Sequence, residues 1–243
     1  MVKILAIGDP HGKLPKNLPR KNIDLILLAG DIGKSDLARK IYLINKLNGI
    51  EPSAKEEVAA HKEIYDSTIK LLKKLSQKNE VYLIMGNVGR SWSKLIQGIK
   101  KIKRVHVAKN SLRKLSGLRI GFLEYFADSC WIKEFEEKDK KRIRRARKET
   151  AKAKKVLARF GKSDVDILVC HQPPYGVLDK VGKKAPKHWK GKHAGSKIIL
   201  NYIKKHSPRY VICGHIHEAA GERKIGKTKV INLGERKYRV IKC

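Results

Sequence analysis

The sequence lacks the features that define several common classes of protein. No apolar run in its 243 residues approaches the roughly 20 residues that a membrane-spanning helix needs. The amino-terminal stretch MVKILAIGDPHG is not followed by a signal-peptide cleavage site. We therefore expect a cytoplasmic protein without a membrane span. GxSxG and P-loop lysine motifs are also absent, which argues against an α/β-type serine hydrolase and a P-loop nucleotide hydrolase.

Cysteine is scarce, and its spacing excludes two kinds of site. The four cysteines are Cys130, Cys170, Cys213 and Cys243, and no CxxC pair occurs among them. A zinc knuckle and a thioredoxin-type redox site are therefore not indicated. Cys170 and Cys213 each end a run of β-branched residues, where a reduced thiol packs as a small hydrophobic side chain. We expect both in the core.

Acidic residues are few relative to basic ones. The chain has 57 Lys and Arg against 23 Asp and Glu, which leaves a formal net charge of +34. A positive field of this size concentrates anionic partners, and polymers of phosphate are the foremost of these. Nucleic acid is therefore a candidate partner. The alternative is that the source organism has lysine-rich proteins in general.

Short apolar runs that end at glycine alternate with helical patterns along the chain. This alternation predicts an α/β core, and the length favours a single domain over residues 1–243. Pieces rich in β-formers and broken by Gly226 and Gly234 predict antiparallel hairpins over 221–240. The predicted strands are Val2–Ile7, Asp24–Ala29, Val81–Met85, Ile167–Val169 and Tyr210–Cys213. The predicted helices are Lys34–Leu47, Lys55–Leu75, Trp131–Phe160 and Gly195–Lys205.

The segment at about 131–160 is predicted to be a basic helical insertion. Apolar residues recur there every three or four positions, so one face of the helix is apolar. The stretch KKRIRRARK at Lys140–Lys148 places positive charge over the remainder. One interpretation is a solvated helix face, and the other is a basic ridge along a polyanionic substrate.

Five predicted strands are followed directly by side chains that can bind a metal ion. Open α/β sheets place ligand sites just beyond the carboxyl ends of their strands. Residues two apart in an extended segment point the same way, so Asp9 and His11 can converge on one ion, as can His215 and His217. The seven donors, in chain order, are Asp9, His11, Asp31, Asn87, His171, His215 and His217.

The donor set itself indicates the kind of metal. Carboxylate, amide and imidazole groups without thiolates suit Mn, Fe, Zn or Ni better than Mg alone. Seven donors exceed what one tetrahedral zinc needs, and they match two divalent ions that share a carboxylate. The ordered set of five strand ends is a much stronger signal than any one of its members.

The series Asp9-x-His11, Gly30-Asp31, Gly86-Asn87, His171 and Gly214-His215-x-His217 resembles the calcineurin-like metallophosphoesterase family. The resemblance covers almost the whole chain and implies a four-layer α/β fold, a double β-sandwich flanked by helices. It also implies a role for each donor. Asp9, His11 and His217 would bind the first metal, and Asn87, His171 and His215 the second, while Asp31 would bridge the two.

The chain departs from the family pattern directly after Asn87. Family members commonly have His and an acid there, and that His assists the leaving group; this sequence has Val88 and Gly89. Neither residue can transfer a proton, so poor leaving groups should suffer most. Some family members with a similar gap act on phosphodiesters. We therefore expect a phosphodiesterase rather than a general monoesterase, with a metal-activated hydroxide as nucleophile.

Two further side chains are candidates for roles near the metals. Arg90 follows the Asn87 motif and is suited to a bidentate contact with phosphate. His193, together with His188, lies in the polar segment after His171. The simpler interpretation of all three is solvent exposure. Two alternatives to a phosphodiesterase also stay open: a nuclease acting on RNA or DNA, and a catalytically weakened nucleic-acid-binding or scaffold protein of the same fold.

Overall fold

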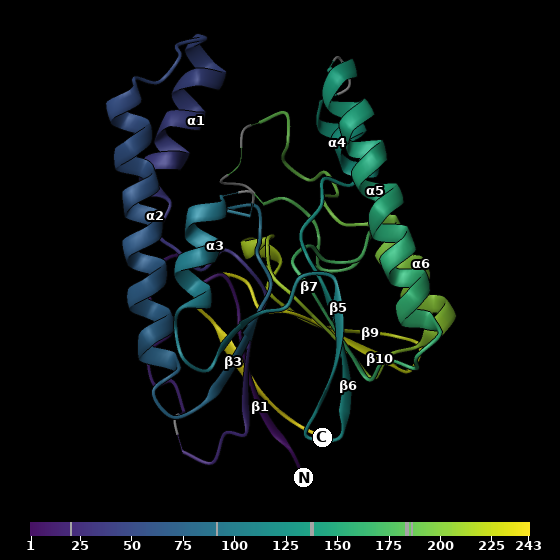
Figure 1. The fold of residues 1–243 in the computed structure, drawn as a ribbon. Helices are drawn as coiled ribbons and strands as arrows, with labels where there is room; N and C mark the ends of the chain where they lie inside the picture. The colour runs from purple at the N-terminus through teal and green to yellow at the C-terminus, as the bar shows by residue number, and fades with distance from the viewer. Residues whose placement is uncertain (20, 91, 137–138, 183–184, 186) are drawn as a thin grey trace.

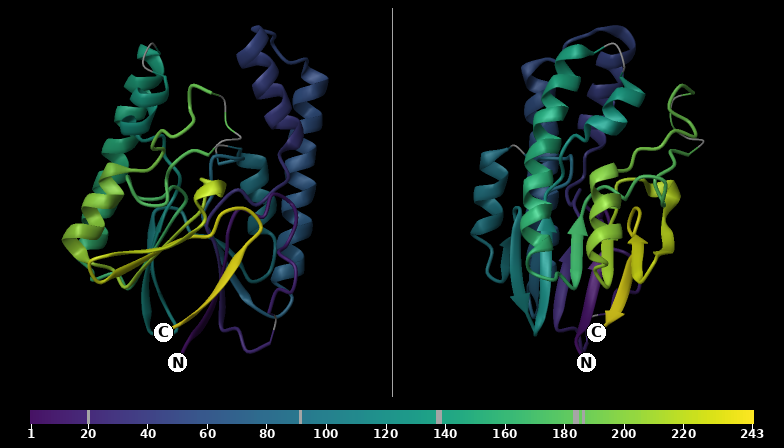
Figure 2. Two further views of the ribbon diagram at one scale, coloured as in Figure 1. Left: turned by 180° about the vertical axis from the view of Figure 1, so that it is seen from behind. Right: turned by 90° about the vertical axis from the view of Figure 1, so that its right-hand side faces the viewer.

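The structure, a computed structural model, describes residues 1–19, 21–90, 92–136, 139–182, 185 and 187–243. Two β-sheets lie face to face, and helices cover the outer face of each sheet (Figures 1 and 2). This is the expected four-layer α/β architecture, a double β-sandwich flanked by helices. The two termini lie side by side at one end of the molecule. No helix in the described ranges is long and apolar enough to cross a membrane.

Each sheet has a parallel centre, with an antiparallel strand at one edge of the first sheet and at both edges of the second. In the first, β1 to β4 are parallel and β11 is antiparallel to β1; in the second, β5 and β9 are the antiparallel edge strands. In spatial order, the first sheet contains β11 (Tyr238–Lys242), β1 (Lys3–Ile7), β2 (Leu25–Leu28), β3 (Glu80–Leu83) and β4 (Val105–Val107). The second contains β5 (Ser111–Leu115), β6 (Leu118–Leu123), β7 (Ile167–Cys170), β8 (Tyr210–Cys213), β10 (Thr228–Asn232) and β9 (Gly221–Ile225).

The helices form the two outer layers. Helices α2 and α3 pack on the first sheet, and α5 and α6 pack on the second. The bounds are α1 (Asp36–Asn48), α2 (Ala54–Leu75), α3 (Ser93–Lys100), α4 (Ser129–Phe135), α5 (Lys140–Gly161) and α6 (Lys197–His206), with a 3₁₀ turn η1 at His217–Ala219.

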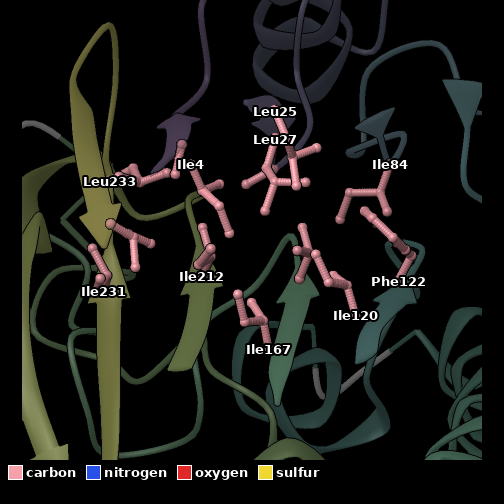
Figure 3. Close-up of a cluster of buried hydrophobic side chains, with 14 of the residues drawn as sticks. Ile4, Leu25, Leu27, Ile84, Ile120, Phe122, Ile167, Ile212, Ile231 and Leu233 are labelled. Carbon is pink, nitrogen blue, oxygen red and sulfur yellow. The ribbon is translucent and has the colours of Figure 1, made fainter. Parts of the chain in front are cut away.

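Burial on both faces explains why the central strands are apolar throughout. Along β1, Ile4 and Ala6 face the second sheet, and Leu5 and Ile7 pack against the cluster that includes α2 and α3. Side chains from both sheets meet in the core between them (Figure 3). Strands buried on both faces need an unbroken apolar sequence, because successive side chains point to opposite sides.

The structure corrects the predicted helix over 131–160. Two helices occupy this part of the chain, α4 and α5, and residues 137–138 between them lie outside the described residues. Each helix has its own amino-terminal cap. Asp128 accepts a hydrogen bond from the Cys130 backbone N–H, and Asp139 accepts one from Arg142. Side-chain capping of this kind marks the start of a helix, so the second Asp begins a new one.

Other elements were not predicted or are arranged differently. Helix α3 and strands β4, β5 and β6 were absent from the prediction, because β5 is mixed in polarity and β4 has only three residues. The predicted hairpin in the tail exists as β9 and β10, which turn at Gly226. Beyond Gly234, however, the chain leaves this sheet, and β11 pairs with β1 of the other.

Candidate metal centre

The seven predicted donors lie at one place, where the carboxyl ends of strands from both sheets meet. Strands β1, β2 and β3 of the first sheet lead into Asp9, Asp31 and Asn87. Strands β7 and β8 of the second sheet lead into His171 and His215. The parallel centres make this convergence possible, because they align the carboxyl ends along one edge of each sheet.

Asp9, His11 and His217 form the first cluster. One donor atom from each lies within 4.8 Å of the others. The Asp9 side chain is fully buried, and its Oδ2 lies 3.2 Å from Nε2 of His217. The other ring nitrogen of His217 is 3.5 Å from the Glu235 carboxylate. A carboxylate beside the second nitrogen of a metal-binding histidine is a common way to orient the ring.

Two buried atoms of the first cluster have no hydrogen-bond partner among the residues that the structure describes. They are Oδ1 of Asp9 and Nε2 of His11. A buried polar atom without a partner is destabilising by roughly 1–3 kcal/mol, and more if it carries charge. Both atoms belong to the three residues whose ligand atoms lie within 4.8 Å of one another. A divalent cation satisfies both, so the residues present fit a metal ion.

Asn87, His171 and His215 form the second cluster. Nδ1 of His171 donates to the carbonyl of Ala29 at 2.8 Å, so Nε2 is the atom that carries the lone pair whenever the ring has a single proton. That nitrogen faces Oδ1 of Asn87 at 3.0 Å, and Nδ1 of His215 lies 3.1 Å from the same oxygen. Two facing acceptors repel each other unless a proton or cation lies between them. The second cluster therefore also fits a metal ion.

Asp31 lies between the two clusters. Its Oδ2 is 3.6 Å from Nε2 of His171, and its Oδ1 accepts a hydrogen bond from the Val88 backbone N–H at 2.9 Å. On the other side of His171, Nδ1 is 3.8 Å from Oδ1 of Asp9. A carboxylate in this position is suited to join two ions.

The structure corrects the argument from extended geometry. His215 and His217 do not point at one ion: His215 contacts Asn87, and His217 contacts Asp9. The backbone of His215 is left-handed, with φ of 68°, and His11 and Asp31 have φ of 43° and 40°. Residues other than glycine seldom adopt this region, and such strain gathers at functional sites. The turn at His215 directs its side chain away from that of His217.

Three glycines give the donors room. A Cβ at Gly86 would collide with the Asp31 carboxylate and the His171 ring. A Cβ at Gly30 would meet Nδ1 of His171, and one at Gly214 would meet the Asp9 carboxylate. The glycines before Asp31, Asn87 and His215 are therefore required because a side chain there would collide with another donor.

For His215, His11 and Asp9 the environment favours the protonation state that metal binding requires. Burial, followed by the nearby charge of His171, lowers the pKa of His215 to about 3. Burial also lowers the pKa of His11. For Asp9, burial opposes ionisation, but the charges of His171 and His217 and a hydrogen bond to His217 outweigh it and lower the pKa. Burial also opposes protonation of His217, yet Asp9 and Glu235 raise its pKa.

The two candidate catalytic side chains are held by other residues. Both Oε atoms of Glu149 accept hydrogen bonds from Arg90, at 2.8 and 3.0 Å, and Arg90 also donates to the carbonyl of Tyr125. Nδ1 of His193 is 2.7 Å from the Asp179 carboxylate. His188, by contrast, is exposed. Direct roles for Arg90 and His193 remain predictions.

Tyr125 is a residue of the centre that sequence analysis missed. Its ring lies 5.5 Å from that of His171 and 5.7 Å from that of His215, measured between centroids. The guanidinium of Arg90 lies 5.1 Å from the same ring. Burial raises the pKa of Tyr125 strongly. The available signal was the apolar stretch GFLEYF, which contains the end of β6 and was not assigned to a strand.

Comparisons with known proteins agree with this geometry. Residues 2–241 match the family described as "Metallophosphoesterase, calcineurin superfamily". The UPF0046 protein T07D4.2 of Caenorhabditis elegans is 29% identical over 241 residues, which is 95% of this chain and 55% of the relative. The chain thus spans about half the length of that curated relative. Metallophosphoesterase domain-containing protein 1 of Homo sapiens is 39% identical over 69 residues, 28% of this chain and 19% of that protein.

A solved structure shows the same fold. A dimetal phosphatase from Danio rerio superposes with a TM-score of 0.54, over 97% of this chain and 88% of that one. The sequence identity is only 13%, so the likeness concerns the fold and does not carry over the activity.

Proposed function

Because the chain belongs to the calcineurin superfamily of metallophosphoesterases, we propose that it is a metal-dependent phosphoester hydrolase, and more narrowly a phosphodiesterase. The observation that supports this most directly is the convergence of seven donors from five strands on one site. We extend the proposal to a single phosphoesterase domain over residues 1–243, with the segment at about 131–160 as a basic helical insertion.

In the proposed centre, each cluster holds one divalent ion. The first cluster and Asp31 would hold one, and the second cluster and Asp31 the other, with Mn, Fe, Zn or Ni as the candidate metals. Ions bound there would lower the pKa of a water toward neutrality and neutralise charge on the phosphoryl oxygens. The carbonyl of Ala29 sets the tautomer of His171 so that Nε2 faces the site. Tyr125 shields the histidine rings from solvent.

The preference for diesters rests on the residues that follow Asn87. Val88 packs against the apolar cluster beneath α2 and α3, and a Cβ at Gly89 would meet Leu95. This loop therefore has no proton donor where the family commonly has one, and a donor there would contribute about 10²–10⁴-fold. Esters whose leaving group needs no proton are the expected substrates.

Hydrolysis of model substrates tests the proposal. The metal content of the purified protein is measured first, and the turnover of an aryl phosphodiester is then compared with that of the matching monoester in the presence of manganese. We expect bound metal and a higher kcat/KM for the diester. Higher activity on the monoester would overturn the substrate preference. A protein that binds no metal and hydrolyses neither ester would instead support the scaffold alternative.

A nuclease is the second candidate function. The observation that favours it is the concentration of positive charge on α5, which is joined to the loop after Asn87 through the Arg90–Glu149 ion pair. Metal-dependent cleavage of a labelled RNA or DNA oligonucleotide would support a nuclease. Hydrolysis of aryl diesters without any cleavage of oligonucleotides would exclude it.

A further inference from the structure

Helices α2 and α5 are a matched pair in length and very different in charge. Each has 22 residues and one buried apolar stripe. Helix α2 has five lysines and four acidic residues, whereas α5 has eleven Lys and Arg and a single acid, Glu149. A lysine-rich composition alone would raise the charge of both helices. The charge is instead concentrated on one of them, which lies on the opposite side of the molecule (Figure 1).

The basic residues of α5 lie on the face that points away from the protein. Ala146, Ala153, Leu157 and Phe160 form the buried face. On the opposite side, one basic residue per turn is exposed, and none of these has an acidic partner among the described residues. These four residues, hereafter the α5 basic row, are Arg144, Lys148, Lys152 and Lys155.

The spacing of the row suits a regular polyanion. A helix rises about 1.5 Å per residue, so the row extends over about 16 Å and its members follow one another every 4.5–6 Å or so. Like charges three or four residues apart on a helix repel each other. A strand of nucleic acid, which has one phosphate for roughly every 3.4 Å of duplex axis, would relieve this repulsion along the whole row.

The row lies on the helix that is fastened to the metal centre. Glu149, in the middle of α5, accepts hydrogen bonds from the Ala127 backbone N–H and from Arg90. Arg90 lies three residues beyond Asn87, and its guanidinium lies over the ring of Tyr125. An anion bound along the row would therefore lie on the outer face of a helix whose inner side is tied to the loop of the centre.

We infer that the α5 basic row binds the phosphate backbone of a nucleic acid. That the bound strand is also the substrate rests on the proposed function, whereas the binding itself does not. A membrane surface fits less well, because the apolar residues of α5 are packed against the second sheet and α6 and leave no apolar face for the lipid boundary. Single-stranded RNA, single-stranded DNA and duplex offer the same backbone chemistry.

Two variants with equal loss of charge test the inference. In one, Arg144, Lys148, Lys152 and Lys155 are changed to Gln, a good helix former. In the matched control, four exposed lysines of α2 are changed in the same way, namely Lys55, Lys70, Lys73 and Lys74. Binding of labelled 20-nucleotide RNA, DNA and duplex is measured between 50 and 200 mM salt with a chelator present, so that hydrolysis cannot contribute. Circular dichroism verifies that both variants are folded.

The wild type should lose affinity steeply as salt rises. Four backbone contacts account for about 50-fold of this loss on a single strand and about 150-fold on a duplex. The α5 variant should lack that part of the salt dependence and bind more weakly at low salt, whereas the α2 variant should match the wild type. Equal weakening of both variants, or none in either, would overturn the inference. So would tighter α5-dependent binding to phosphatidylserine vesicles than to any of the three nucleic acids.

Turnover of the aryl phosphodiester separates this inference from the proposed function. Neither set of substitutions touches a proposed metal ligand, so both variants should keep wild-type turnover on this small substrate. Nucleic-acid binding through α5 without aryl hydrolysis would support the inference and contradict the proposed hydrolase activity. Aryl hydrolysis without binding through α5 would support the hydrolase activity and contradict the inference.

Discussion

The first and second clusters of the metal centre differ in burial and in charge. The first contains Asp9, a carboxylate that is fully buried. The second contains only neutral donors, and one of them, Asn87, is exposed. A buried carboxylate attracts a cation strongly because little water screens it, whereas an exposed amide contributes only a dipole. If each cluster binds an ion as proposed, we expect the ion of the first cluster to be bound more tightly than that of the second.

Asp31→Asn should have the largest effect, because it would weaken metal binding at both clusters at once. We expect metal content to fall below one ion per chain and kcat on an aryl phosphodiester to fall by about 10³-fold or more, the scale of losing a principal electrostatic element. Asp36→Asn, at an exposed position early in α1, is the matched control and should retain both properties. Two bound ions in Asp31→Asn would contradict the bridging role.

Asp9→Asn should affect the first cluster more than the second. The substitution removes the buried charge while it keeps the shape of the side chain. Manganese titration of the metal-free wild type, followed calorimetrically, should show a tight and a weaker phase, and this variant should lose the tight phase. Turnover should fall by about 10²-fold or more. Loss of the weaker phase instead would show that the first cluster binds manganese less tightly than the second.

Asn87→Ala should affect the second cluster with a smaller and recoverable loss. Removing one neutral ligand should weaken the second ion by about 10–100-fold, by analogy with other supporting groups of metal sites. Millimolar manganese should therefore restore most of the turnover of Asn87→Ala but not that of Asp9→Asn. Failure of high manganese to rescue Asn87→Ala would show that the amide does more than bind metal.

Glu149→Gln should have the smallest effect on turnover. It tests whether the Glu149–Arg90 pair, which contacts Tyr125, matters to metal binding at the second cluster. The variant weakens the partly buried pair with Arg90, so the free energy of unfolding at pH 7 should fall by about 1–3 kcal/mol. The second manganese phase should weaken slightly while the first is unchanged. An equal shift in both phases would indicate a general structural role. Arg90→Lys keeps the charge but loses the bidentate contact, so its unfolding free energy should lie between those of the wild type and Glu149→Gln.

The same pair predicts a dependence of stability on pH. Burial opposes ionisation of Glu149, but hydrogen bonds from Ala127 and Arg90 and the charge of Arg90 outweigh it and lower its pKa below the usual 4.5. A lowered carboxyl pKa stabilises the fold fully above the unfolded value, and the contribution decreases as pH falls through the folded value. The difference in unfolding free energy between wild type and Glu149→Gln should thus be constant from pH 6 to 8 and shrink below about 4.5.

Much of the centre could be predicted because its donors follow strands that are buried on both faces. Such strands are recognisable as unbroken apolar runs, and each is followed by a donor, as Asp31 and His171 show. Strand β5 was missed because this edge strand is mixed in polarity and has a weak pattern of its own. The family resemblance assigned His215 and His217 to different metals, but the argument from extended geometry wrongly let them converge on one ion. The left-handed backbone at His215 depends on its surroundings, and no local pattern reveals it.

The order of residues along the chain was enough to predict the α/β class, most of the central strands, the seven candidate donors and the concentration of positive charge on one helix. Periodicity and residue type are local properties, so they can be recognised in one dimension. Tertiary packing, by contrast, placed the Tyr125 ring against the rings of His171 and His215 and paired Arg90 with Glu149. Those contacts join residues far apart in the chain, and packing in three dimensions selects them.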